Sequence, residues 1–279
     1  MRTTMHIAKR VFLYLFLTFA TIVMSFPLFW MISSSLKTIE ETNSAGIVWF
    51  PPQPTFQAYI NIFNNATFMR SYFNSVFYTT LALVGTLASI AVVAYAFSRV
   101  KWPGRNLVFF LMLSTMMIPS QALLVPQYVF FNKLGWIGTF NPLIIPGYFA
   151  GGAAMIFLLR QSMSQIPKEL DESAVMDGAN HIQIFWEVVL PLVKAPIATI
   201  ATLLFVGLWN SLLVPIMYLQ TVDLYTLPIY VSTLYNINLT VQPWPTIMAA
   251  AVLTTVPLMV VFFFAQRYIL DSVVISGLK

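Results

Sequence analysis

The sequence predicts an all-α integral membrane protein with six transmembrane helices, arranged as a single membrane domain over residues 1–279. Charged residues make up 8% of the 279 residues and hydrophobic residues 59%, whereas roughly 25% of an ordinary soluble domain is charged. A soluble chain of this length could not cover its surface with so few charges. The apolar runs are continuous and lack the alternation of lumen-facing strands, which favours helices over a barrel.

The composition also limits the chemistry that the chain can perform. It has no cysteine, so it contains no disulfide and no thiolate metal site. Its two histidines, His6 and His181, are too few for a histidine-rich metal site. The net charge of +5 is typical of a cytoplasmic excess of Lys and Arg in a membrane protein, so we expect membrane lipid and no nucleic acid as a partner.

Six apolar segments are long enough to cross a bilayer core, which needs about 20 residues per helix. They are residues 11–35, 72–98, 107–131, 142–159, 195–219 and 246–266. The first segment follows a basic N-terminus, so a secretory signal peptide is the alternative interpretation. It is too long for a typical signal peptide and ends without a small-residue cleavage site, so we expect a retained first span.

The distribution of Lys and Arg predicts the orientation of these spans. With the N-terminus inside, eleven basic residues lie on the cytoplasmic side: Arg2, Lys9, Arg10, Arg99, Lys101, Arg105, Arg160, Lys168, Lys194, Arg267 and Lys279. Three lie outside, namely Lys37, Arg70 and Lys133. We therefore expect both termini and the polar segment 165–191 to face the cytoplasm.

Several predicted spans carry internal prolines, which kink membrane helices while neighbouring groups satisfy the freed carbonyls. These are Pro27, Pro119, Pro126, Pro146, Pro215 and Pro257. Kinked helices suit a pathway that opens and closes, although proline is also generally common in membrane helices. Gly147 and Gly151 form a GxxxG pair, which predicts a close helix contact in the fourth span.

The polar segment 165–191 lies between the fourth and fifth spans and holds five of the nine acidic residues. These are Glu169, Asp171, Glu172, Asp177 and Glu187. Such a concentration of charge in an otherwise apolar chain predicts a docking surface for a soluble partner. An amphipathic loop on lipid head groups is the alternative, but the inner leaflet is itself negative and would repel acidic side chains.

Local signals in this segment predict two short helices joined by a sharp turn. Pro167 suits the first turn of a helix, and the acidic residues that follow it match the positive end of the helix dipole. Gly178 supplies a stop, because glycine accepts the left-handed conformation. Asn180 and Gln183 resemble a capping box that begins the second helix.

The second helix carries apolar side chains at helical spacing, which predicts one apolar face. They are Ile182, Phe185, Trp186 and Val189. Pro191 and Pro196 are expected to limit this helix before the fifth span begins. The segment thus combines acidic groups and an aromatic face on a helix-turn-helix.

The run ESAVMDGA begins at Glu172 and is followed by Phe185 and by Leu190-Pro191. This motif resembles the EAA loop of ATP-binding cassette importer permeases, in which EAAxxDGA precedes a Phe and then LP. The matching residues are Glu172, Ala174, Asp177, Gly178, Ala179, Phe185, Leu190 and Pro191. Ser173 replaces the middle Ala of the pattern, a change of one small residue for another.

Further motifs extend the resemblance over nearly the whole chain. They are Ser34-Ser35-Leu36-Lys37-Thr38, Asn74-Ser75, Tyr95-Ala96-Phe97-Ser98-Arg99, Pro103-Gly104-Arg105, Met117-Ile118-Pro119, Ile166-Pro167-Lys168-Glu169-Leu170 and Trp209-Asn210. In this order they are similar to the carbohydrate-uptake group, in particular to the second permease subunit of maltose-type sugar transporters. The C-terminal tail departs from that group, because Ser272 and Ser276 stand where glycine is expected.

The resemblance implies a coupling role for the cytoplasmic segment and a set of partners. The implied ATPase-coupling residues are Glu172, Ala174, Asp177, Gly178, Phe185, Trp186 and Pro191. The implied partners are a second homologous permease, two ATP-binding cassette ATPase subunits that bind ATP and Mg²⁺, and an extracytoplasmic solute-binding protein. The implied location is the bacterial or archaeal cytoplasmic (inner) membrane. The chain has no GxxxxGK[ST] phosphate loop, so it is expected to be non-enzymatic and without a cofactor of its own.

The function implied by the resemblance is the uptake of a sugar or oligosaccharide. Gln121, Trp209 and Asn210 are candidates for its translocation pathway, because sugars suit aromatic faces with a few amide groups. Packing between helices is the favoured alternative for Trp209 and Asn210, since a lone polar pair is a weak indication of a ligand site.

Two other functions remain open as alternatives. The same machinery could carry a non-sugar or acidic solute such as glycerol phosphate or a uronate oligosaccharide. An intramembrane cluster of Lys or Arg would favour an anionic cargo, and the predicted spans show none. A membrane-embedded enzyme would need convergent titratable residues at one depth, which the spans also lack.

Overall fold

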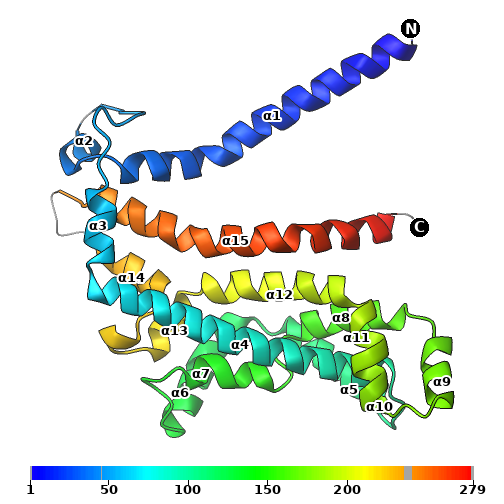
Figure 1. The fold of residues 1–279 in the computed structure, drawn as a ribbon. Coiled ribbons are helices and arrows are strands. Elements are labelled where there is room, and N and C mark those ends of the chain that lie inside the picture. Colours follow the sequence, from blue (N-terminus) through cyan, green and yellow to red (C-terminus); the bar gives the residue numbers. More distant parts are fainter. Residues whose placement is uncertain (1, 45, 236–240, 278–279) are drawn as a thin grey trace. The chain divides into compact units, whose positions relative to one another are not determined.

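The computed structural model of the protein describes the backbone of residues 2–44, 46–235 and 241–277, and the side chains within these stretches from residue 9 to residue 268. Every regular element in these stretches is helical (Figure 1), which confirms the predicted all-α class. The chain divides into two compact units. Unit 1 comprises residues 1–68 and 231–256, and unit 2 comprises residues 69–230 and 257–279.

Unit 1 contains the first long helix, the segment that follows it and the beginning of the last helix. Its elements are α1 (Arg2–Ser35), α2 (Ile39–Asn43), α3 (Gln57–Phe63) and the first part of α15 (Trp244–Gly277). A capping box begins α2, in which Thr38 and Glu41 exchange side-chain to backbone hydrogen bonds. The Ser35 hydroxyl shares a 2.8 Å hydrogen bond with the Tyr59 hydroxyl, which attaches α3 to the end of α1.

Unit 2 is built around α4 (Ala66–Ser98), most of which it contains, and α8 (Ala153–Ser164). The other elements of unit 2 are α5 (Arg105–Ser114), η1 (Thr115–Met117), η2 (Ser120–Leu123), α6 (Leu124–Lys133), α7 (Asn141–Ile144), η3 (Ile145–Tyr148), α9 (Glu169–Met176), α10 (His181–Gln183), η4 (Ile184–Val189), α11 (Leu190–Leu192), α12 (Lys194–Trp209), α13 (Leu213–Tyr218), η5 (Val222–Leu224) and the start of α14 (Leu227–Leu234). Its largest apolar core joins α4, α8 and the helices from α10 to α12.

Four stretches of helix are long and apolar enough to cross a membrane. They are Lys9–Ser35, Ala66–Ser98, Asn141–Ser164 and Trp244–Tyr268. These stretches overlap the first, second, fourth and sixth predicted spans in sequence. The count rises to six if each of two sharply bent helix pairs is one span.

The third predicted span, 107–131, is a bent pair rather than one continuous helix. The segments Arg105–Met117 and Ser120–Lys133 meet at an angle of 92°. Pro119 has no N–H to continue the ladder and disfavours the helical conformation of the residue before it. Ile118 accordingly adopts the extended conformation, with φ −83° and ψ 118°.

The fifth predicted span, 195–219, is not one continuous helix. Helix α12 ends at Trp209, and its bent partner is the preceding segment His181–Leu192, at 80° across Val193. The side-chain amide of Asn210 donates to the Val206 carbonyl at 3.0 Å and so competes with the helical ladder. Pro215 then lies in the separate short helix α13.

The predicted GxxxG contact is confirmed at one of its two glycines. A Cβ at Gly147 would collide with the Thr86 side chain on α4, so the backbones approach closely there. Gly151 instead faces Gly147 within its own segment, because the chain is irregular between η3 and α8. Gly85 on α4 makes the reciprocal approach, since its Cβ position is filled by the Tyr148 ring.

We expect Gly85→Ala to destabilise the protein by about 1–3 kcal/mol, because the added methyl overlaps the Tyr148 ring. The measurement is the apparent Tm of the purified protein in detergent. Gly207→Ala is the matched control, because no atom lies within 4 Å of its added Cβ and alanine favours the helix. Removal of the ring in a Tyr148→Ala background should abolish most of the cost of Gly85→Ala; an undiminished cost would contradict the packing explanation.

Candidate functional site

The first helix of the polar segment has the predicted start and stop. Helix α9 carries three acidic residues in its first turn, where the helix dipole stabilises them. It ends in a Schellman motif, with Ala179 N–H donating to the Ala174 carbonyl at 2.9 Å and Gly178 N–H to the Val175 carbonyl at 3.0 Å. Gly178 has φ +87°, the left-handed conformation that the turn requires. Pro167 precedes the helix instead of lying in its first turn.

The second helix begins at the predicted capping box. The Asn180 side chain accepts from the N–H groups of Ile182 and Gln183 at 2.9 and 3.0 Å, and the Gln183 side chain accepts from Asn180 N–H at 2.9 Å. The helix ends at Leu192, between Pro191 and Pro196 as expected. Pro191 lies inside a run that continues through the π-helix η4 into α11, and the chain bends at Val193.

The π-helix η4 accounts for how Pro191 is accommodated. A proline in a helix lacks the N–H that would bond to the preceding turn. A π-helix relaxes the ladder by one residue per turn and is frequent at functional sites. In Figure 1, α9, α10 and α11 lie together at the end of unit 2 where α8 terminates.

Arg99 makes buried contacts that its sequence motif did not indicate. Its side chain is 4% exposed, and its guanidinium donates to the Asp171 carboxylate at 3.1 Å. It also donates to the carbonyls of Met163 and Ile166 at 2.6 and 2.9 Å. One buried cation therefore ties together the end of α4, the end of α8 and the coupling helix candidate α9.

Arg99 appears in the sequence analysis as a cytoplasmic basic residue and as part of the motif Tyr95-Ala96-Phe97-Ser98-Arg99, but neither observation assigned it a partner. Arg99 directly follows a long apolar span, and an acid-rich segment occurs later on the same predicted side. An arginine in that place can satisfy both helix-terminal carbonyls and a carboxylate, because its guanidinium carries five donors in a fixed plane. The sequence alone could not select Asp171 among five acidic residues.

Aromatic packing attaches the second helix to α4. The rings of Tyr95 and Phe185 lie 5.1 Å apart, and the Tyr95 hydroxyl donates to the His181 carbonyl at 3.1 Å. Phe185 and Val189 are buried in the core with Leu159 and other residues of α8. The contacts hold this helix against both α4 and α8.

The prediction of a single apolar face on the second helix is wrong. Phe185 and Val189 are 7% and 0% exposed, whereas Ile182 and Trp186 are 70% and 63% exposed. The π-helix changes the angular spacing of side chains, so a pattern written for an α-helix does not describe it. Phe185 thus belongs to the core of this chain, and Trp186 is the aromatic group available to a partner.

The outward side of α9 combines acidic and apolar groups. We call it the α9 surface and define it by the exposed residues Leu170, Glu172, Val175, Met176 and Asp177. Ala174 faces the opposite way and packs against the core. The exposed Ser173, which replaces Ala in the EAA pattern, donates its hydroxyl to the Glu169 carbonyl, so the replacement leaves the packing unchanged.

The three pathway candidates lie in different environments. Trp209 is 2% exposed and contacts the rings of Tyr72 and Phe205 at 6.0 and 5.6 Å, which fits the packing alternative. Asn210 is exposed at the end of α12, and Gln121 is exposed on η2. Among the described residues, no group of three His, Cys, Asp or Glu side chains lies close enough to hold a metal ion.

These features define a helical membrane protein in which the exposed acidic helix α9 is attached to the ends of α4 and α8. A profile of the family described as "Binding-protein-dependent transport system inner membrane component" matches residues 85–274. The chain belongs to this family, and the predicted resemblance to importer permeases is confirmed. It is a permease subunit of a binding-protein-dependent importer and has no catalytic role of its own.

Relatives extend over the whole length of the chain. It is 32% identical over 267 residues to the arabinooligosaccharides transport system permease protein AraQ of Halalkalibacterium halodurans, covering 94% of this chain and 93% of AraQ. It is 28% identical over 276 residues to the trehalose/maltose transport system permease protein MalG of Thermococcus litoralis, covering 98% of each.

A solved structure resembles this chain in both sequence and fold. It belongs to a bacterial ABC transporter involved in the import of the acidic polysaccharide alginate. The match has a TM-score of 0.83 and 27% identity, and it covers 92% of this chain and 95% of the other.

We expect Arg99→Met to destabilise the protein by about 3–5 kcal/mol, because it leaves Asp171 and two carbonyls without their buried donor. Hydrogen exchange in α9 should accelerate more than exchange in α4. Arg70→Met is the matched control, because Arg70 pairs with Asp223 at an exposed site and such pairs contribute about 0–1 kcal/mol. Unchanged exchange of residues 169–176 in Arg99→Met would contradict the proposed tie.

Proposed function

We propose that the chain is one of two homologous permeases in an ATP-driven importer of a sugar or oligosaccharide. An extracytoplasmic solute-binding protein delivers the solute, and two cytoplasmic ATPase subunits bind ATP and Mg²⁺. The observation that carries the proposal is the α9 surface, an exposed acidic and apolar patch held by Arg99 at the ends of two long helices. That arrangement suits a surface through which a soluble motor moves membrane helices.

The mechanical argument rests on how firmly α9 is attached. A force on α9 passes through the Arg99 guanidinium, which bonds to α9 and to the end of α8, and reaches α4 because Arg99 directly follows that helix. The buried core around Phe185 passes the same force to the second helix and on to α12. Packed elements with several hydrogen bonds move as rigid bodies, so closure of the ATPase pair would tilt these helices and switch the pathway.

The coupling residues then divide into two roles. Glu172, Asp177 and Trp186 are exposed and would contact the ATPase directly. The others would shape the docking unit from within: Ala174 and Phe185 in the core, Gly178 in the turn and Pro191 in the bent helix.

We also infer a six-span topology with both termini in the cytoplasm. Each bent pair would then count as one span, with α9 on the cytoplasmic side. The bias of Lys and Arg supports this orientation, and membership of an inner membrane component family supports the bacterial or archaeal inner membrane.

The translocation pathway is proposed to follow the helix breaks. Broken backbone is tolerated at membrane depth only where it is buried in protein or lines an aqueous cavity. Gln121 lies directly after the break at Pro119, and Asn210 lies where α12 ends, and both side chains are exposed. We therefore propose these two amides as pathway groups and Trp209 as a packing residue beside them.

A neutral saccharide is the favoured cargo. Several relatives are named for oligosaccharide or disaccharide transport, and the positively charged Arg70 is neutralised by Asp223. The second candidate is an acidic solute such as a uronate oligosaccharide or glycerol phosphate. The similarity to the transporter of the acidic polysaccharide alginate supports this alternative. Binding of neutral and acidic oligosaccharides to the companion solute-binding protein distinguishes the two.

We expect Glu172→Lys to abolish uptake while leaving the amount of protein in the membrane unchanged, because it reverses an exposed charge of the α9 surface. Gly178→Pro should have the same effect, since proline cannot adopt φ +87°. Uptake of labelled substrate and membrane immunoblots are the measurements. Glu40→Lys, at an exposed position on α2, is the control and should transport normally. Normal transport in Glu172→Lys would refute the docking role.

Phe185→Ala and Trp186→Ala distinguish packing within the permease from contact with the ATPase. Phe185→Ala should destabilise the permease itself by about 3–5 kcal/mol, because the ring is buried. Trp186→Ala should change stability by no more than about 0.5 kcal/mol yet reduce the amount of ATPase that co-purifies in mild detergent. The pair of measurements is apparent Tm and subunit ratio; an unchanged subunit ratio in Trp186→Ala would remove this indole from the interface.

A further inference from the structure

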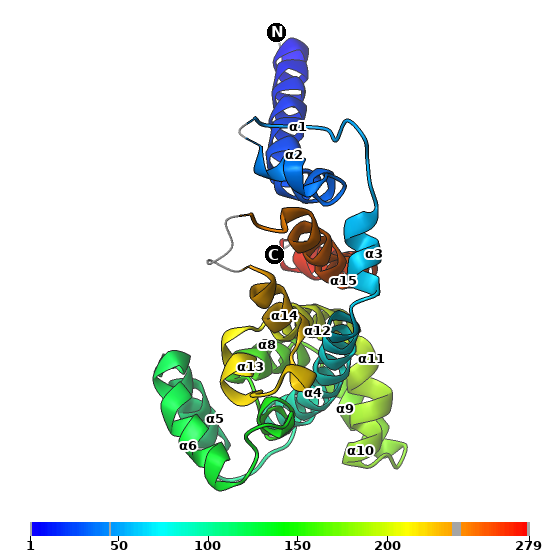
Figure 2. The ribbon, with the colours of Figure 1, turned by 90° about the vertical axis from the view of Figure 1, so that its left-hand side faces the viewer.

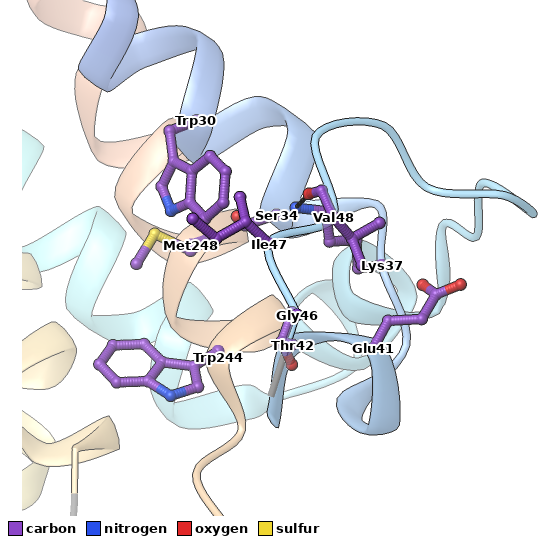
Figure 3. A pocket seen from close by; sticks show the side chains of 10 residues that line it. All are labelled: Trp30, Ser34, Lys37, Glu41, Thr42, Gly46, Ile47, Val48, Trp244 and Met248. Atoms are coloured by element: carbon purple, nitrogen blue, oxygen red, sulfur yellow. Dashed lines mark hydrogen bonds between the residues drawn. The ribbon is translucent and has the colours of Figure 1, made fainter. Parts of the chain in front are cut away.

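Unit 1 contains a cavity of about 350 Å³. It lies where the end of α1, helix α2, the turn at residues 46–48 and the start of α15 meet (Figure 3). Ser34, Lys37 and Glu41 are polar residues of its lining, and Trp30, Trp244 and Met248 are apolar ones. The volume is at the lower end of the range for small-molecule sites, about 300–1,000 Å³.

Lys37 is a buried cation with unused donors. The residue is 3% exposed, its amino group donates to the Val48 carbonyl at 2.5 Å, and it lies 4.3 Å from the centroid of the Trp30 ring. An ammonium carries three N–H donors, and the Val48 oxygen is its one hydrogen-bond acceptor among the described residues. Burial lowers the pKa of Lys37, and the nearby Glu41 charge opposes that shift. An anionic oxygen in the cavity would complete its environment.

Ser34 supplies a second hydrogen-bond donor at the same place. Its neighbours are bonded: the Ser33 hydroxyl donates to the Trp49 carbonyl at 2.6 Å, and the Ser35 hydroxyl is paired with Tyr59. Ser34 is 4% exposed and lines the cavity, and its hydroxyl has no hydrogen-bond partner within the described part of the chain. Because Ser34 lines the cavity, a ligand oxygen bound there could accept a hydrogen bond from its hydroxyl.

The apolar wall fits a lipid better than a sugar ring. Trp30 already contacts the Lys37 amine, and the rings of Phe26 and Trp49 lie 6.4 and 6.0 Å from it. This leaves little of its ring faces for stacking on a saccharide. The side chains of α1 that precede Trp30 form an exposed apolar surface, with Phe26 46% and Phe29 37% exposed. The cavity therefore has a polar end and adjoins the continuous apolar surface of α1.

We propose that this cavity binds the head group of a membrane phospholipid, with its phosphate against Lys37 and Ser34 and its acyl chains along α1. Lys37 and Glu41 together give the lining no net charge, which favours a zwitterionic head group such as phosphoethanolamine over a net anionic one. The ammonium of that head group would face the Glu41 side of the cavity. Tryptophans at the ends of membrane helices are suited to this depth of the bilayer.

The test uses the full chain, purified from membranes with the subunits that accompany it and then stripped of lipid. Native mass spectrometry counts molecules bound during titration with dioleoyl phosphatidylethanolamine. Lys37→Met should weaken binding of one lipid by about tenfold or more, because a charge-assisted hydrogen bond is lost. Ser34→Ala should weaken it less, and Lys133→Met, at an exposed lysine, should leave it unchanged. Equal binding by Lys37→Met and the unaltered chain would overturn the proposal.

Further measurements distinguish a lipid phosphate from free phosphate, and one of them uses the unaltered protein so that a misfolded variant cannot explain the result. Dioleoyl phosphatidylglycerol should bind more weakly, and inorganic phosphate should not displace the lipid; displacement would identify a free anion site and overturn the lipid assignment. On the unaltered protein, a phosphatidylethanolamine with a photoreactive head group should label peptides around Trp30, Lys37 and Trp244. Labelling spread evenly along α1 would also overturn it. None of these measurements depends on transport, so their outcome is independent of the proposed function.

Discussion

The buried guanidinium of Arg99 is the interaction on which the organisation of the candidate site depends. It satisfies two carbonyls at the end of α8 and one carboxylate on α9, while Arg99 itself closes the end of α4. A helix end needs partners for its last carbonyls, and a buried cation needs a counter-charge. One side chain meets both needs, so α9 has a defined position despite its short length and exposed outer side.

Besides the Arg99 contacts, two breaks in long helices determine how the segments of unit 2 are arranged. Two pairs of segments bend by 92° and 80° where a continuous apolar run suggested straight spans. Pro119 causes the first bend, and the π-helix with Pro191 precedes the second. A bend exposes backbone groups that water or protein must satisfy, which is why such places recur at pathways and switches. The coupling candidate and the pathway candidates therefore lie at irregular backbone, whereas the straight parts of α4 and α8 supply the packed support.

Sequence reasoning succeeded where the signal is local. The capping box at Asn180 and the left-handed turn at Gly178 depend on a few neighbouring residues, and both formed as expected. Four long apolar helices were also recoverable, because length and hydropathy decide them. The apolar face of the second helix could not be predicted, because the π-helix altered the angular spacing of its side chains. The pairing of Arg99 with Asp171 could not be predicted either, because the two residues lie 72 positions apart in the chain.

The sequence by itself determined that this protein resides in a membrane, that it is helical and that it presents an acidic helix-turn-helix, because composition, apolar length and capping chemistry are properties of short stretches. The tertiary structure alone decided which aromatic residue is buried, which carboxylate meets Arg99 and which of three adjacent serines has no partner. These outcomes depend on contacts between elements distant in the chain. The adjacent rings of Phe185 and Trp186 contact each other, but only Phe185 is buried, against Tyr95 of α4.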